Sequence, residues 1–130
     1  MSNIDFFIED ETDIYNETYI KVELDNLDIK NKTISNTKLE RCNLTTSDYD
    51  NTYFEKVEFI NCDLSNTKFI NCNFREVTFD NCKLVGTNIS NCHITKLEIT
   101  SSLCKYINIV DSKIKELEIK CNEKMDWDYL

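Results

Sequence analysis

The chain has 130 residues, which fits one domain of about 100–200 residues and leaves no room for two. Hydrophobic residues make up 41% and charged residues 30%, a composition that excludes a disordered chain, and no apolar run approaches the roughly 18 residues of a membrane helix. The 24 acidic and 15 basic residues leave a net charge of −9, which argues against direct nucleic-acid binding because that function needs a basic face.

The N-terminal segment, residues 1–13, holds five acidic residues and no basic one. It lacks the basic region followed by an apolar stretch that marks a secretory signal, so the sequence favours a cytoplasmic location. Ile4, Phe6, Phe7 and Ile8 make this segment apolar enough to serve as a cap on one end of the structure built by the residues that follow.

Residues 14–119 repeat with a period of five. Every fifth residue from Tyr19 to Ile119 is apolar or cysteine, and we call these the centre positions. The period matches neither the 3.6 residues of a helix nor the 2 of a strand. The centre positions that we expect in the core include Phe54, Phe59, Leu64, Phe69, Phe74, Phe79 and Leu84.

Two further positions follow the same period. The residue two before each centre is small or apolar from Thr37 onward, and the cysteines Cys62, Cys72, Cys82 and Cys92 occupy this position. The residue two after each centre is often asparagine, and the single glycine, Gly86, also lies there. Asparagine tolerates the left-handed backbone conformation, so it can make a turn every five residues in a chain that has no proline.

These features resemble the pentapeptide repeat family, most closely at Cys62-Asp63-Leu64, Cys72-Asn73-Phe74 and Thr87-Asn88-Ile89. The resemblance implies an all-β fold, a right-handed quadrilateral β-helix in which four pentapeptides form the four sides of a 20-residue coil. The centre residue and the small residue before it would point inward. Residues 14–119 then make about five coils, with short capping segments at 1–13 and 120–130.

The seven cysteines are expected to be reduced thiols, because the chain shows no secretion signal. A 20-residue coil stacks Cys42, Cys62 and Cys82 in one interior column and Cys72 and Cys92 in another. A disulfide within a column is the alternative, and the parallel side chains argue against it. Further along, Leu103 and Cys104 suggest a local slip of the repeat, with Leu103 competing for the inward position.

Charge is unevenly distributed over the four sides. The side centred on Phe59 and Phe79, which we call the acidic side, has an excess of acidic residues, whereas the side centred on Phe54 and Phe74, the basic side, has an excess of basic ones. Residues of the acidic side form the candidate partner face, namely Glu58, Asp80, Glu98 and Glu118.

The sequence does not predict an enzyme, a metal site or a cofactor site. Glycine is nearly absent, so no phosphate-binding loop is present, and the cysteine spacing lacks the close pairs of zinc sites. The single histidine, His93, has no partner at a spacing that suggests catalysis. The flat sides of a β-helix also lack the concave pocket that an active site needs.

The C-terminal segment, residues 120–130, leaves the repeat and ends in apolar residues. Two interpretations stay open for these side chains: a cap on the last coil, or the contact of a homodimer that joins two rods end to end. The residues are Met125, Trp127, Tyr129 and Leu130.

For function, the sequence predicts a non-enzymatic protein-interaction module whose partner is a protein that the sequence does not identify. The alternative comes from the resemblance: quinolone-resistance members of the family are similar to B-form DNA in shape and charge and bind DNA gyrase. Such a DNA mimic needs negative charge spread along the rod to meet a basic groove. Most of the net charge here lies in residues 1–13 instead.

Overall fold

The computed structural model describes residue 7 and residues 12–124. Residues 12–124 consist of β-strands joined by turns, with no helix among them. The fourteen strands are β1 (Ile14–Tyr15), β2 (Thr18–Ile20), β3 (Asp28–Lys30), β4 (Thr33–Glu40), β5 (Asp48–Asp50), β6 (Tyr53–Ile60), β7 (Lys68–Ile70), β8 (Asn73–Asp80), β9 (Asn88–Ser90), β10 (His93–Ile94), β11 (Leu97–Leu103), β12 (Asn108–Val110), β13 (Lys113–Ile114) and β14 (Leu117–Asn122).

The chain turns at the positions that the five-residue period predicts. Nearly every residue two after a centre has a positive φ, including ten asparagines with φ between 47° and 58° and Gly86 at 70°. Asparagine carries this conformation at low cost, which explains how a chain with one glycine can turn so often. Lysine, arginine, glutamate and other residues also occupy these corners, where the stacked coils impose the backbone conformation.

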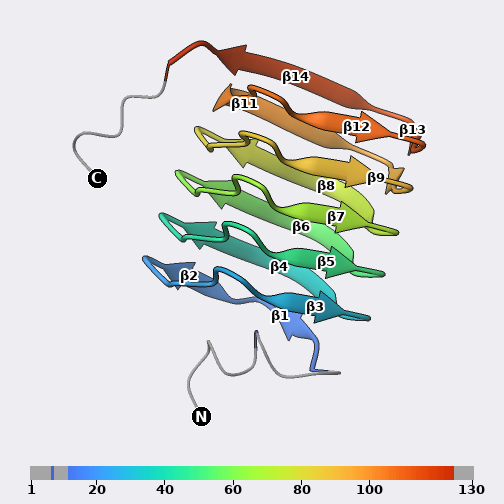
Figure 1. The fold of residues 1–130 in the computed structure, drawn as a ribbon. Coiled ribbons are helices and arrows are strands. Elements are labelled where there is room, and N and C mark those ends of the chain that lie inside the picture. Colours follow the sequence, from blue (N-terminus) through green and yellow to red (C-terminus); the bar gives the residue numbers. More distant parts are fainter. Residues whose placement is uncertain (1–6, 8–11, 125–130) are drawn as a thin grey trace.

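Successive coils stack in parallel, and each residue pairs with the one 20 positions further along the chain (Figure 1). The eight-residue strands β4, β6 and β8 bend at their positive-φ residue, so one sheet covers both the basic and the acidic side. A second sheet of β3, β5, β7, β9 and β12 forms another side. The remaining side, which we call the bridge side, is held by single parallel bridges such as Asn43 to Asp63.

The core is a set of stacked layers inside the coils. The expected core residues are all at most 2% exposed, namely Phe54, Phe59, Leu64, Phe69, Phe74, Phe79, Leu84, Cys62, Cys72, Cys82 and Cys92. Because the coils stack in register, equivalent phenylalanine rings of successive coils lie over each other. The ring centroids of Phe54 and Phe74 are 5.3 Å apart, and those of Phe59 and Phe79 are 4.8 Å apart. These distances follow from the strand spacing of about 4.8 Å.

The structure corrects the expected slip at Leu103 and Cys104. Leu103 pairs with Lys83 at the regular 20-residue offset, and the next corner, Tyr106, keeps its positive φ. The register changes later, between β11 and β14, where Ile119 pairs with Ile99 but Cys121 pairs with Ser102. The repeat therefore continues undisturbed until the last strand, because a stacked coil below imposes its backbone path.

Candidate interaction surfaces

The four residues of the candidate partner face all lie on the acidic side, on strands β6, β8, β11 and β14. Glu58, Glu98 and Glu118 share one column of the parallel sheet, and Asp80 lies in the neighbouring column on the same side. The structure thus brings these carboxylates to one surface. Glu58 and Glu118 are exposed, whereas Asp80 and Glu98 are half-buried.

The carboxylates do not form an unbroken row. Read along the rod, their column contains Thr18, Lys38, Glu58, Thr78, Glu98 and Glu118. Lysines partly neutralise the last two: Lys96 Nζ lies 3.7 Å from Glu98 Oε1, and Lys120 Nζ lies 3.0 Å from Glu118 Oε1. Asp80 accepts a hydrogen bond from the hydroxyl of Thr100 at 3.2 Å. The negative potential of this side is therefore local and interrupted.

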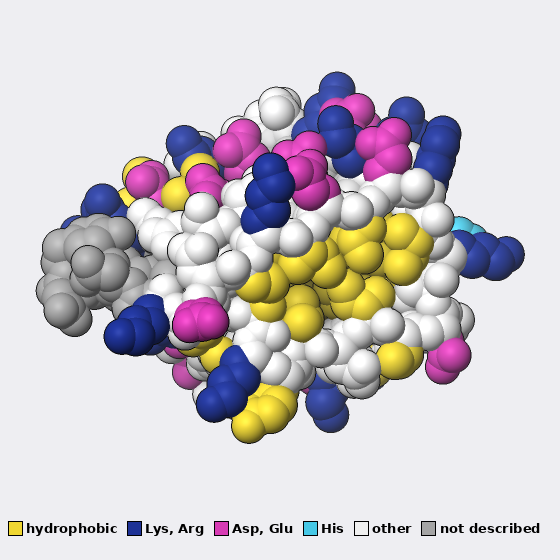
Figure 2. Space-filling view, turned by 90° about the horizontal axis from the view of Figure 1, so that it is seen from above, with side chains coloured by type: hydrophobic (Ala, Val, Ile, Leu, Met, Phe, Trp, Pro, Cys, Tyr) yellow, Lys and Arg dark blue, Asp and Glu magenta, His cyan; other side chains and the backbone are white. Residues whose placement is uncertain are grey.

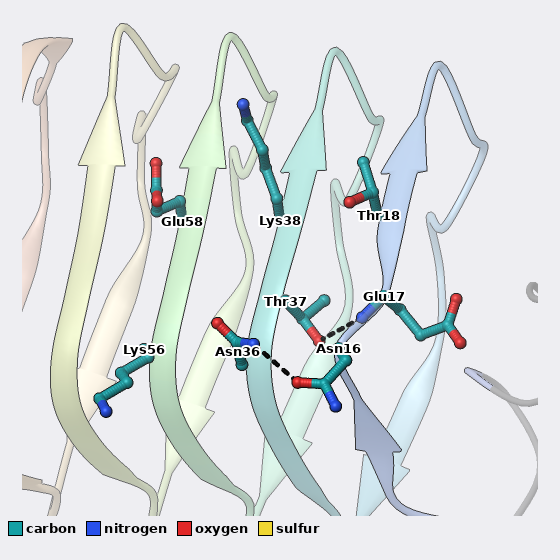
Figure 3. Close-up of a pocket in the computed structure, with 8 residues that line it drawn as sticks. All are labelled: Asn16, Glu17, Thr18, Asn36, Thr37, Lys38, Lys56 and Glu58. Carbon is teal, nitrogen blue, oxygen red and sulfur yellow. Dashed lines mark hydrogen bonds between the residues drawn. The ribbon is translucent and has the colours of Figure 1, made fainter.

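A hollow at the N-terminal end of the same side is shallow and polar. Its lining side chains lie on the outer surface of neighbouring coils, with Lys38 on the strand next to that of Glu58 and Lys56 lower on the Glu58 strand (Figure 3). Asn36 Nδ2 donates to Asn16 Oδ1 at 2.6 Å, so the amides at this corner bond to each other. The volume of the hollow, about 290 Å³, lies just below the usual range of small-molecule sites, and its lining is mostly polar where such sites are mostly apolar.

The two thiol columns are buried and engaged in hydrogen bonds. Cys62 Sγ donates to the carbonyl of Leu39 at 3.2 Å, and Cys92 Sγ donates to the carbonyl of Phe69 at 3.4 Å. The hydrogen bond with the Cys62 thiol and burial raise the pKa of Cys42, and the hydrogen bond with the Cys92 thiol and burial raise that of Cys72. The hydrogen bond with the Cys72 thiol lowers the pKa of Cys92, but all five thiols are buried away from solvent reagents, so these columns act as small apolar core groups.

His93 and the metal-ligating residue types form no site in the described part of the chain. His93 is exposed on β10, where Asn73 and Lys113 are its neighbours along the rod. Within residues 7 and 12–124, no three or more histidine, cysteine or acidic side chains gather around a position that a metal ion could occupy. Among the same residues, no helix has the length and apolar character needed to cross a membrane.

Cysteine chemistry differs from the sequence-based expectation at one place. Cys104 and Cys121 form a disulfide, with their Cα atoms 5.7 Å apart, whereas all seven cysteines were expected to be reduced thiols. The bond is not within either column. Counted in fives, Cys121 falls at a corner position where two of the coils below have asparagine, Asn61 and Asn81, and this unusual placement is the signal in the sequence that could have indicated the bond.

The C-terminal end of the rod exposes the interior of the last coil. Seen from above, apolar side chains gather in the middle of this end and charged ones lie around it (Figure 2). Ile114 is 47% exposed and Ile119 41%, although both are centre positions whose counterparts Ile94 and Ile99 are buried. Ile107, Ile109 and Leu117 are partly buried beside them, and we call these five residues the end surface. Met125, Trp127, Tyr129 and Leu130, the candidate dimer contact, lie outside the described residues.

Comparisons with known proteins agree with this architecture. A family model described as a pentapeptide repeat region matches residues 52–126. The crystal structure of the pentapeptide repeat protein Rfr23 from the cyanobacterium Cyanothece 51142 superposes with a TM-score of 0.62 at 17% identity, over 96% of each chain. At that identity the likeness shows the fold alone. No curated protein sequence matches the chain significantly.

A second set of solved structures is more distant. A trypsin-treated form of QnrB1, a plasmid-mediated fluoroquinolone resistance protein, matches with a TM-score of 0.43 at 15% identity, over 77% of this chain and 49% of the other. This similarity is too weak to carry an argument about function. The family model and the 20-residue register lead to the same conclusion, which confirms the expected family and fold: the chain belongs to the pentapeptide repeat family.

Proposed function

We propose that this protein is a non-enzymatic interaction module that docks a partner protein on its end surface, and that the partner is a second copy of the same chain. The observation that carries the proposal is the exposure of Ile114 and Ile119, two core-type residues, at the open end of the rod. Contiguous apolar surface rimmed by polar residues is typical of protein–protein contacts. The cytoplasmic location expected from the sequence belongs to this proposal and is testable by cell fractionation.

The difference between the two ends supports a pair over a longer assembly. At the N-terminal end, Phe7 is 1% exposed and packs on Tyr19, so the core is covered there. A rod with two open ends would join others into a fibre, whereas a rod with one open end meets a second copy through the same surface and closes. Among the described residues, the outer edges of β12, β13 and β14 pair with no further strand, and a second copy could pair with them.

The test is the oligomeric state of a charged variant against a matched control. Ile114→Lys places a charge in the middle of the end surface, and Ile20→Lys places the same charge at an equally exposed isoleucine (53%) far from it. Sedimentation equilibrium should give a dimer for the wild type and for Ile20→Lys, and a monomer for Ile114→Lys. A wild-type monomer at high micromolar concentration would overturn the proposal and assign the covering of the end surface to the chain's own last residues.

DNA mimicry toward DNA gyrase was the alternative from the sequence, and the arrangement of charge does not favour it. A mimic of the phosphate backbone needs closely and regularly spaced negative charge. The column through Glu58 contains Lys38 and Thr78, and lysines lie next to both Glu98 and Glu118. A supercoiling assay with the wild type and a Glu58→Lys/Glu98→Lys/Glu118→Lys variant tests this alternative; inhibition by the wild type alone would restore it.

A further inference from the structure

The last coil lacks half of the contacts that hold the other coils. An interior strand such as β6 pairs with β4 on one side and β8 on the other, but β12, β13 and β14 each pair with one strand only. No described residue stacks on their outer edge. Elements with unpaired edges and exposed side chains are the first to open in native proteins, so this coil needs another source of stability.

A covalent bond supplies that stability. The last coil begins on the bridge side, where Cys104 occupies the centre position that Leu24, Leu44, Leu64 and Leu84 hold in the coils below. It ends on β14 at Cys121, and the disulfide between the two closes a loop with a sequence separation of 17. Every side of the coil, and every residue of the end surface, lies between these two cysteines.

The register change in β14 is what lets the two cysteines meet. Between the pairs Ile99–Ile119 and Ser102–Cys121, two residues of β11 oppose one residue of β14. The strand therefore skips the corner that Ser101 makes in the coil below and continues straight toward the bridge side. Such a bulge redirects a strand at a sheet edge, and here it carries Cys121 to the start of its own coil.

We propose that the Cys104–Cys121 disulfide is a redox-controlled latch on the last coil, which holds the end surface in its docking-competent form when oxidised and releases it when reduced. This inference rests on the proposed function for its biological meaning, but the latch itself concerns only the order of the last coil. In the cytosol, the compartment that the sequence favours, disulfides are usually transient and regulatory, which fits a switch better than a permanent structural bond.

The switch is an ordinary thiol–disulfide exchange with a low-molecular-weight dithiol or disulfide as co-reactant. In reduction, a dithiol thiolate attacks Cys121 Sγ, whose residue is exposed, the bond to Cys104 breaks, and Cys104 leaves as a thiolate that takes up a proton. The second thiol of the reductant then displaces Cys121 from the mixed disulfide. The protein gains two electrons and two protons, and the dithiol becomes a cyclic disulfide. A disulfide oxidant such as oxidised glutathione drives the reverse reaction and forms the Cys104–Cys121 bond again.

The other cysteines do not compete in this exchange. All five are free thiols buried inside the rod, and their hydrogen bonds run to backbone carbonyls of the same or the preceding coil. After mild reduction under native conditions, iodoacetamide should therefore label Cys104 and Cys121 and leave the five buried thiols unmodified. Peptide mass spectrometry of the labelled full-length chain measures this selectivity.

The deciding experiment is amide hydrogen exchange of the full-length protein with and without dithiothreitol. Reduction should speed exchange in residues 108–122 at least about tenfold, because loop closure no longer restrains the last coil, while residues of β6 and β8 should not change. The Cys104→Ser/Cys121→Ser variant is the control: it should exchange like the reduced wild type and should not respond to the reductant. Equal exchange in oxidised and reduced wild-type protein would overturn the latch.

Sedimentation of the same samples separates this inference from the proposed function. Dimers in the oxidised state that dissociate on reduction, in the wild type and in Ile20→Lys alike, support both. If oxidised protein is monomeric but reduction still opens residues 108–122, self-docking is wrong and the latch stands. If dimers persist unchanged in fully reduced protein, redox control of the end surface is wrong and the docking surface stands.

Discussion

The two ends of the rod differ in how the terminal coil is held and how its core is covered. At the N-terminal end, Phe7 from outside the repeat lies on Tyr19 with ring centroids 5.4 Å apart, nearly perpendicular, and both side chains are at most 2% exposed. At the C-terminal end, the disulfide Cys104–Cys121 closes the last coil, but Ile114 and Ile119 stay exposed. The first end is covered by packing and the second is closed by a covalent bond.

The difference shows that ending a solenoid and covering its core are separate requirements. A repeat buries a centre residue only when coils lie on both sides of it, so the terminal coils cannot be stable by the repeat alone. Packing a bulky residue meets both requirements at once. A disulfide meets only the first, and here it leaves Ile114 and Ile119 exposed.

The largest expected effect is at the covered end. Phe7→Ala removes a buried aromatic ring and exposes Tyr19, so the free energy of unfolding should fall by about 3–5 kcal/mol. Ile114→Ala at the open end removes a half-exposed side chain and should cost about 1 kcal/mol or less. Urea denaturation followed by circular dichroism measures both. Similar losses for the two variants would show that the ends are equally covered.

A substitution at Gly86 tests the corner beneath the open end. Gly86 has φ +70°, a Cβ added there would lie 2.6 Å from Asn66 Oδ1, and its N–H donates to the carbonyl of Lys105 in the last coil. Gly86→Ala should therefore cost about 1–3 kcal/mol. Adding Asn66→Gly removes the atom that the new Cβ meets, keeps the positive φ of residue 66 at low cost, and should restore part of the loss. An unchanged urea midpoint in the single variant would contradict this strain.

Tyr49 lies in the middle of the rod and serves as a reference that neither end affects. Its hydroxyl is buried and has no hydrogen-bond partner among the described residues, while its ring stacks on Phe69 at 5.2 Å. Tyr49→Phe keeps the ring and removes the unpaired hydroxyl, so we expect a gain of about 1 kcal/mol in the free energy of unfolding. A loss of similar size in urea denaturation would show that the hydroxyl has a partner in solution.

A further expected effect is a pH dependence at the N-terminal end. Burial and the nearby Glu17 carboxylate raise the pKa of Tyr19 from 10.0 to about 12. The unfolded state then loses this proton first, so stability is complete below pH 10 and falls as the pH rises from 10 to 12. Tyr19→Phe should lose less stability across this interval than the wild type. Identical alkaline curves for the two proteins would contradict the prediction.

Much of the fold could be predicted because the repeat is periodic and local. Phe54 and Phe74 are 20 residues apart, and the coil length alone places one ring over the other. The corner asparagines likewise depend only on the backbone conformation of one residue at a time. For the same reason, the column of Glu58, Glu98 and Glu118 could be assigned to one side before the structure was known.

The disulfide and the register change could not be predicted in this way. Counting in fives places Cys104 in the interior and Cys121 at a corner, two positions that the repeat keeps apart. They meet because β14, on which no described strand stacks further, departs from the 20-residue offset after Ile119. Lys32 is a similar case: it occupies an inward position that the repeat gives to small residues, yet it is 2% exposed because its ammonium group donates to the carbonyl of Thr12, outside the repeat pattern.

The sequence by itself determined the coil, its corners and its core, since each depends on a five-residue pattern that repeats through the chain. Only the tertiary structure decided how the rod ends: which residue covers Tyr19, where β14 leaves the register, and which isoleucines stay exposed. The physical reason is that a repeat specifies contacts between neighbouring coils. At an end there is no neighbour, so contacts from outside the pattern determine the structure there.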